Sequence, residues 1–180
     1  MAFGIDTRVD WRWLMGTYWY VVEPDLPALQ LAADGRTLEW IVDQTVWQIT
    51  GFRSGYLWGT TAVLIREDEA EAGTSRRGPR VTHLTMLGTV TPSGQVQITF
   101  APVGRSPIEP TVGFGQMVKE GPFWRFEMQM STNRGKRRVL HWATMVQTHP
   151  GEASWERLPG TDLSVPAMLE GAEPPRFGDR

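Results

Sequence analysis

The segment FWRFEMQMSTNRGKRRVLHWATMVQT, from Phe123 to Thr148, decides the fold class of this chain. Consecutive side chains of a strand point to opposite faces, so apolar residues at every second position predict a strand with one buried face. In FWRFEMQM, one face holds Trp124, Phe126, Met128 and Met130, and the other holds Phe123, Arg125, Glu127 and Gln129. KRRVLHWATMVQT alternates in the same way after the turn STNRG. The segment therefore predicts two antiparallel strands joined by a short turn.

The rest of the chain repeats this arrangement of short alternating segments between turn signals. The expected strands are residues 17–22, 28–33, 36–42, 45–50, 56–65, 80–90, 95–100, 112–118, 123–130 and 136–148. Asp34-Gly35 is a strong hairpin signal between the second and the third of them. We expect an all-β fold, a single antiparallel up-and-down β-barrel of about 8–10 strands, because closure removes exposed sheet edges. The interior of such a barrel holds side chains or one small ligand.

The length of 180 residues fits one domain. We expect the barrel over residues 1–158, followed over residues 159–180 by a tail rich in proline and glycine. This tail is expected to be a mobile end or an arm lying on a neighbouring molecule. Short helical turns are expected within Ile5–Met15 and within Asp162–Gly171, and the charged segment Arg66–Pro79 is expected to be a solvated loop.

Charge and composition argue against several functional classes. The chain has 18 basic and 20 acidic residues and a net charge of −2, so neither nucleic acid nor a membrane is an expected partner. It has no cysteine, and its three histidines lack the spacing of a zinc site, so we expect no metal. We also expect no cofactor, because no phosphate-binding glycine motif occurs. Without a signal-peptide pattern or an apolar stretch of roughly 20 residues, the expected location is cytoplasmic.

One of the nine tryptophans, Trp19, lies in a segment with a family resemblance. MGTYWYV (Met15–Val21) resembles the Gly-x-Trp-Tyr motif with which lipocalin-like proteins of the calycin group begin their barrel. Two residues instead of one separate Gly16 from Trp19, so either Tyr18 takes the plugging position or a bulge restores the register. The resemblance implies an up-and-down barrel whose closed end holds this aromatic residue with an arginine stacked on it. The candidates for that arginine are Arg125, Arg137 and Arg138.

Aromatic and polar residues of the strands are the candidates for binding a ligand. Alternation places Tyr18 and Tyr20 on the face opposite Trp19. We expect Trp19 to pack structurally and the two tyrosines to face the cavity, where a phenol can orient a polar group of a ligand. Core packing with a solvated hydroxyl is the alternative for these tyrosines. The full set of candidate ligand-binding residues is Tyr18, Tyr20, Tyr56, Trp58 and Arg125.

A catalytic barrel would need acid/base groups, for which His83, His141 and Glu127 are the candidates. Each histidine has a structural alternative, as a hydrogen-bonded residue of the barrel wall. Arg125 and Glu127 share a strand face, where an exposed surface ion pair is the alternative to a pair inside the barrel. Asp43 is expected at the solvent-facing edge of a hairpin.

Three functions remain open from the sequence. The first is a carrier or binding protein that holds a small hydrophobic or aromatic molecule in the barrel cavity. The second is a cofactor-independent lyase, isomerase, hydratase or cyclase that uses acid/base residues in the same cavity. The third is a structural or protein-interaction barrel, and a homodimer is compatible with all three. The enzymatic hypothesis requires at least two titratable groups close to each other on the inner wall.

Overall fold

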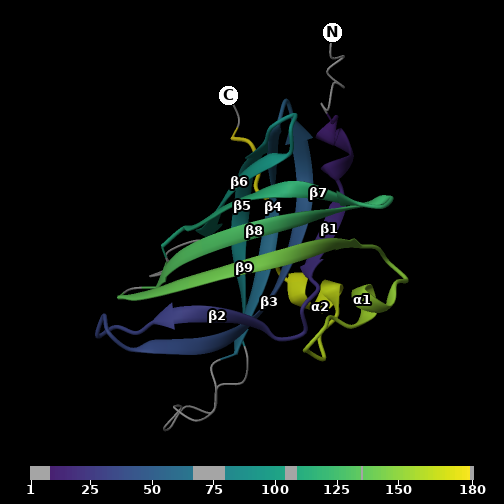
Figure 1. Ribbon diagram of the computed structural model, residues 1–180. Coiled ribbons are helices and arrows are strands. Elements are labelled where there is room, and N and C mark those ends of the chain that lie inside the picture. The colour runs from purple at the N-terminus through teal and green to yellow at the C-terminus, as the bar shows by residue number, and fades with distance from the viewer. Residues whose placement is uncertain (1–8, 67–79, 104–108, 135, 179–180) are drawn as a thin grey trace.

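The chain forms a closed antiparallel β-barrel, described here by a computed structural model that covers residues 9–66, 80–103, 109–134 and 136–178 (Figure 1). The strands are β1 (Thr17–Val21), β2 (Leu26–Leu31), β3 (Leu38–Arg53), β4 (Tyr56–Arg66), β5 (Arg80–Val90), β6 (Gln95–Pro102), β7 (Thr111–Glu120), β8 (Phe123–Arg134) and β9 (Arg137–Thr148). Three short helices accompany them: η1 (Trp11–Leu14), α1 (Ala153–Glu156) and α2 (Val165–Leu169). The expected loop at 66–79 lies outside the described residues, apart from Arg66 at the end of β4.

Two short strands, β1 and β2, together occupy one position in the barrel wall and close the barrel. Both β1 and β2 pair with β3 on one side and with β9 on the other, one after the other along the same position in the wall. The remaining strands follow in sequence order from β3 to β9, each pairing with the next. The prediction of an all-β, up-and-down antiparallel barrel is therefore confirmed.

Strand β3 is longer than the sequence predicts. Residues 36–42 and 45–50 were expected to form separate strands, but β3 runs unbroken through Asp43 and Gln44, with a bulge between Ile49 and Gly51. The polar side chains in the middle of this strand have partners that a single segment of sequence does not reveal. Gln44 Nε2 donates to the carbonyls of Val21 and Pro159, and Thr45 Oγ1 donates to Asp43 Oδ1.

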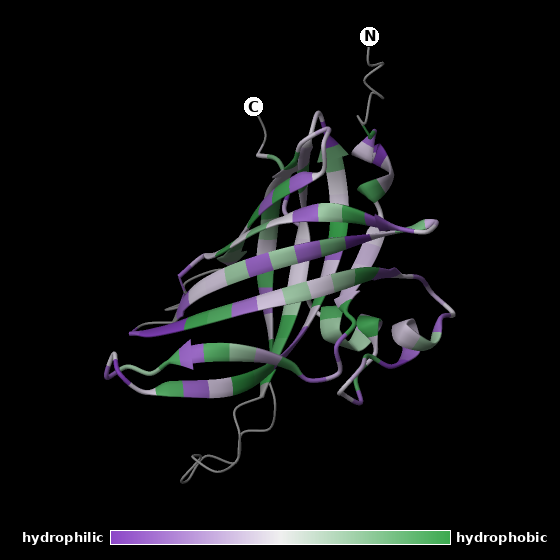
Figure 2. Ribbon diagram, viewed as in Figure 1, coloured by the Kyte–Doolittle hydropathy of each residue, from purple (hydrophilic) through white to green (hydrophobic). Residues whose placement is uncertain are grey.

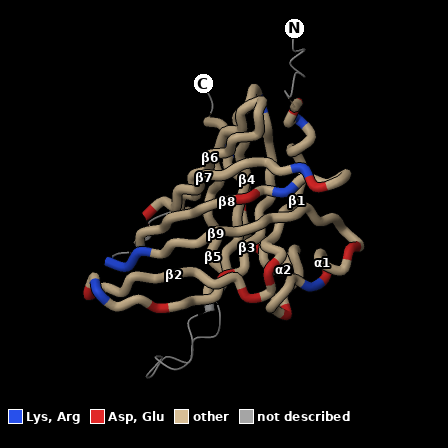
Figure 3. The backbone as a smooth tube through the Cα atoms, in the orientation of Figure 1, with Lys and Arg blue, Asp and Glu red and all other residues tan. Residues whose placement is uncertain are grey.

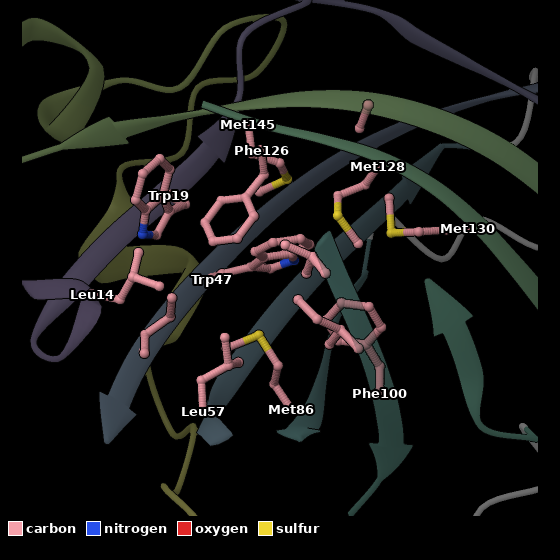
Figure 4. Packing of buried hydrophobic residues seen from close by; sticks show 14 of the residues in the cluster. Leu14, Trp19, Trp47, Leu57, Met86, Phe100, Phe126, Met128, Met130 and Met145 are labelled. Carbon is pink, nitrogen blue, oxygen red and sulfur yellow. The ribbon is translucent and has the colours of Figure 1, made fainter. Parts of the chain in front are cut away.

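The inner wall near η1 is filled by large apolar side chains (Figure 4). The ring of Phe126 lies between two indoles, with its centroid 4.6 Å from that of Trp19 and 5.3 Å from that of Trp47. Trp11 and Leu14 of η1 are buried against this cluster and close this end of the barrel. The expected N-terminal helical turn is thus confirmed, as a 3₁₀ helix. Hydropathy alternates along the strands, as their two faces require (Figure 2).

A second apolar cluster lies outside the barrel. Val46, Ala62 and Leu64 point outward from β3 and β4 and are covered by residues of the C-terminal segment. Three of those residues, Leu158, Val165 and Met168, are at most 1% exposed. The expectation of a mobile end or an arm on a neighbour is therefore wrong for residues 159–169 of the tail. The expected helical turn within residues 162–171 is confirmed by α2, which begins after Ser164, whose hydroxyl accepts from the N–H of Ala167.

Candidate functional site

Tyr18 and Tyr20 lie on the outside of the barrel, whereas Trp19 is completely buried inside it. The Tyr18 ring packs edge-on against Trp155 at 4.8 Å, and its hydroxyl accepts from Gln48 Nε2. Alternation correctly separates the tyrosines from Trp19, but the expectation that they face an interior cavity is wrong. The outer wall carries its own apolar cluster under the C-terminal segment, and the tyrosines belong to that cluster.

Tyr56 and Trp58 also point outward, since Leu57 between them is buried in the inner cluster. Tyr56 is 63% exposed, and the ring of Trp58 contacts the ring of Phe177 at 5.1 Å. Neither side chain lies on the inner wall.

Arg125 and Glu127 form an ion pair on the outer face of β8, on either side of the buried Phe126. The guanidinium Nη2 lies 2.8 Å from Glu127 Oε1, and Nη1 also binds Glu120. Arg125 therefore points away from Trp19, which lies inside. The surface ion pair that the sequence left open as an alternative is the arrangement found.

The two strand histidines lie on opposite faces of the barrel wall. His83 is outside, where its Nε2 lies 2.8 Å from the backbone oxygen of Met168 and joins β5 to α2. This is the structural alternative considered for a histidine of the wall. His141 follows the buried Val139 on the same face of β9, with a side chain that is only 9% exposed.

Asp43 is the partner of His141 on the inner wall. His141 Nδ1 lies 3.1 Å from Asp43 Oδ2, and the aspartate side chain is 5% exposed. The other carboxylate oxygen accepts from Thr45 Oγ1 at 3.1 Å. The expectation of Asp43 at a solvent-facing hairpin edge is wrong, because β3 continues through this position and turns the side chain inward. The signal for it is that Asp43, Thr45 and Trp47 occupy alternate positions of one strand.

Several polar atoms of the barrel are buried without a hydrogen-bond partner among the described residues. Trp47 Nε1, His141 Nδ1, Gln30 Oε1 and Glu23 Oε2 are in this state. For His141, the nitrogen is close enough to Asp43 for charge interaction, but the two groups are not aligned for a hydrogen bond. Gln30 uses its amide nitrogen to bind Glu39 Oε2 at 2.7 Å and leaves its oxygen unpaired. Burying such an atom unpaired costs about 1–3 kcal/mol.

The inner wall thus changes from polar to aromatic along β3. Asp43, Thr45 and Trp47 span about 13 Å at the usual rise of a strand. At one end of this stripe lie a carboxylate, a hydroxyl and an imidazole, and at the other end the indole ring of Trp47 contacts the rings of Phe100 and Phe126. This boundary between polar and aromatic surface is the candidate site. It offers an N–H donor for a ligand acceptor and a histidine–aspartate pair for proton exchange.

Two depressions are found on the outer wall. One, of about 840 Å³, is lined by Tyr20 and by residues 153, 154 and 157–162. The other, of about 490 Å³, lies over β2, β8, β9 and the start of β3. Within the described ranges, no cluster of three or more histidine, aspartate or glutamate side chains is placed to hold a metal ion. The helices of the same ranges are all too short or too polar to span a bilayer.

Comparisons of the chain with protein-family models, with curated proteins and with solved structures gave no match. The function therefore has to be argued from the site itself.

Proposed function

We propose that this barrel binds one small organic molecule with an apolar or aromatic body and a polar group, held inside at the boundary between Trp47 and His141. The observation that carries the proposal is the pair of buried nitrogens, Trp47 Nε1 and His141 Nδ1, that lack a hydrogen-bond partner. Unpaired buried donors cost free energy, and a ligand that supplies an acceptor recovers it. We place this binding protein in the cytoplasm and among the lipocalin-like barrels, in line with the Gly16–Val21 segment.

The apolar part of the proposed site can adapt to a guest. The cluster around Trp47 contains five methionines, Met86, Met117, Met128, Met130 and Met145, of which all but Met117 are labelled in Figure 4. Methionine is unbranched and repacks at low cost, so these side chains can yield space to an aromatic ring. Phe100 and Phe126 then contact the ligand through their rings, as they contact Trp47 in this structure, where the ring of Phe126 is edge-on and that of Phe100 is tilted.

A second candidate function is acid/base catalysis in the same place, favoured by the 3.1 Å contact between His141 and Asp43. A carboxylate beside Nδ1 favours the tautomer that carries its proton there and leaves Nε2 as the basic nitrogen. Such an imidazole can act as a general base or a general acid. The reaction class would be that of a cofactor-independent lyase, isomerase, hydratase or cyclase.

Native mass spectrometry of the freshly purified chain tests the binding proposal. We expect a non-covalent adduct in the wild type, and a smaller adduct fraction in Trp47→Phe and in His141→Gln. The control is His83→Gln, which changes the histidine on the outer wall and leaves the interior intact. Two results contradict interior binding: the absence of an adduct in all four proteins, or an adduct fraction that is reduced only in His83→Gln.

Solvent deuterium separates a carrier from an enzyme. The molecule recovered after incubation with the protein in D₂O gains carbon-bound deuterium if His141 exchanges a proton with it. The enzymatic candidate predicts this gain with the wild type and its loss with His141→Gln. If the mass of the recovered molecule is unchanged after incubation with the wild type, proton exchange at carbon is excluded and the carrier function remains.

A further inference from the structure

The outer wall carries an exposed apolar surface that is separate from the interior site. This outer apolar surface consists of Leu29, Leu31, Leu38, Trp40, Leu140 and Trp142. Its residues lie side by side across three strands, because Leu29 is paired with Trp40 on β3 and with Leu140 on β9. Their chain neighbours Ala28, Gln30 and Val139 are buried, so alternation turns this set outward. The outer faces of β9 and β2 are toward the viewer in Figure 1.

The exposure of this surface is high for residues of this size. Leu38 is 63% exposed, Trp40 64%, Leu140 54% and Trp142 57%. Contiguous apolar groups of this kind mark interaction sites on soluble proteins. On another part of the wall, the C-terminal segment covers the outward residues Val46, Ala62 and Leu64. The described part of the chain provides no such cover for the outer apolar surface.

The outer apolar surface contains a groove, and beside it lie exposed side chains that could fill the same groove on a second copy. The groove of about 490 Å³ is lined by four leucines of the surface together with Ser131, Asn133 and Arg138. Trp40 and Trp142 lie next to it, each more than half exposed. A two-fold axis brings identical surfaces together, so that each copy can offer its exposed indoles to the groove of the other.

The charges at the groove are also self-complementary. Arg138 lines it, and Glu109 accepts a hydrogen bond from the groove residue Asn133 at 2.8 Å. Asn133 and Arg138 are directly opposite in the β8–β9 register. One positive and one negative group therefore lie on the same face, as pairing of two identical faces requires. Charged residues gather mainly at the strand ends and turns in this region (Figure 3).

We propose that the outer apolar surface is the interface of a homodimer, with a second copy of this chain as its occupant. A peptide strand fits less well, since β2 is paired with both β3 and β9 and leaves no sheet edge for main-chain pairing. An anionic membrane fits less well, because Glu109 lies beside the groove.

The size of the surface sets the expected strength of the dimer. From β3 across β2 to β9 the strands span about 10 Å, and from Arg138 to Trp142 the chain rises about 13 Å. This area is smaller than a standard interface, which buries about 800 Å² on each partner and surrounds its apolar centre with a polar rim. We therefore expect a reversible dimer that dissociates on dilution.

Sedimentation velocity of the full chain over a wide concentration range tests the proposal. The wild type is expected to pass from monomer to dimer, and Leu140→Lys to raise the dissociation constant by roughly tenfold or more. The matched control is Leu87→Lys, which changes a leucine that is 50% exposed on the outer face of β5. Thermal unfolding of both variants shows that the barrel is intact.

A charge exchange identifies the surface independently of its leucines. Arg138→Glu is expected to weaken the dimer, and the double variant Arg138→Glu with Glu109→Arg to restore it. A wild type that stays monomeric at the highest concentrations, or a dimer that Leu140→Lys leaves intact, overturns the proposal. Pelleting of the wild type with anionic phosphatidylserine vesicles in place of self-association also overturns it and assigns the surface to a lipid.

Discussion

His141 Nδ1 lies 3.1 Å from Oδ2 of Asp43, across a strand that separates the two residues in the barrel wall. Asp43 is on β3 and His141 on β9, and β2 pairs with both of these strands. Ala28 lies on the buried face of β2 and is 1% exposed. A small side chain on the intervening strand favours the approach of the larger imidazole and carboxylate groups from the two flanking strands. The contact joins the broken side of the barrel, where β1 ends and β2 begins.

This pair should be energetically coupled. Asp43→Asn keeps the size of the side chain and removes its charge, and we expect it to lower the free energy of unfolding by about 1–3 kcal/mol. In a double-mutant cycle with His141→Gln, the two losses should be non-additive by about 0.5 kcal/mol or more. Urea denaturation measures each variant. The matched control is Glu39→Gln with His141→Gln, which changes another acid of the same strand and should be additive.

The aromatic cluster should depend on Phe126. This residue is fully buried between Trp19 and Trp47, so Phe126→Ala is expected to lower the free energy of unfolding by about 3–5 kcal/mol. Phe123→Ala on the same strand is the control, because Phe123 is 75% exposed and its loss should be nearly neutral. Equal effects of the two substitutions in chemical denaturation would contradict the packing described here.

The C-terminal segment should stabilise the barrel that it covers. Met168 is fully buried against the outer wall, and Met168→Ala is expected to cost about 2–5 kcal/mol of unfolding free energy. Met15→Ala serves as the control, since Met15 is 59% exposed. Thermal unfolding measures both, and a Met168→Ala melting temperature equal to that of the wild type would show that the segment is only loosely attached.

The β2–β3 hairpin should be sensitive to acid. Hydrogen bonds from Thr37 and from the N–H of Arg36 lower the pKa of Asp34 to about 2. The carboxylate has a higher pKa in the unfolded chain, about 3.9, so it stabilises the folded state above that pH and loses this effect as the pH falls through about 2. In Asp34→Ala, the melting temperature should be lower than in the wild type near neutral pH. The difference should shrink below about pH 4 and vanish only below about pH 2, and a difference that does not shrink between pH 4 and pH 2 contradicts the assignment.

The sequence predicts the barrel because alternation and turn signals are local. FWRFEMQM places Phe126 and Arg125 on opposite faces, as expected from its pattern, and the N-terminal turn and α2 lie within their expected ranges. The same alternation cannot say which face is inside. For Tyr18 and Tyr20 the choice depends on α1, α2 and their neighbours, which cover the outer wall more than a hundred residues later in the chain.

The candidate site was predictable only in part. The sequence offers His141 as a candidate, whereas its pattern divides β3 near Asp43 and so places this residue at a solvent-facing edge. Nothing in the local pattern distinguishes Trp47 from the other tryptophans. A polar residue such as Asp43 within a strand is read from sequence as part of a turn, because its partner, His141, lies far away on β9. Long-range pairing of this kind leaves no trace in the local pattern.

The NMR signal of the Trp47 indole N–H tests the central claim most directly. It is assigned as the ¹H–¹⁵N resonance that disappears in Trp47→Phe, and it is followed while the molecule recovered from the purified protein is added to protein stripped of it. We predict a saturable shift of the Trp47 resonance, with the Trp40 and Trp142 resonances unchanged on the outer wall. A shift confined to Trp40 and Trp142, with Trp47 unmoved, would contradict binding inside the barrel.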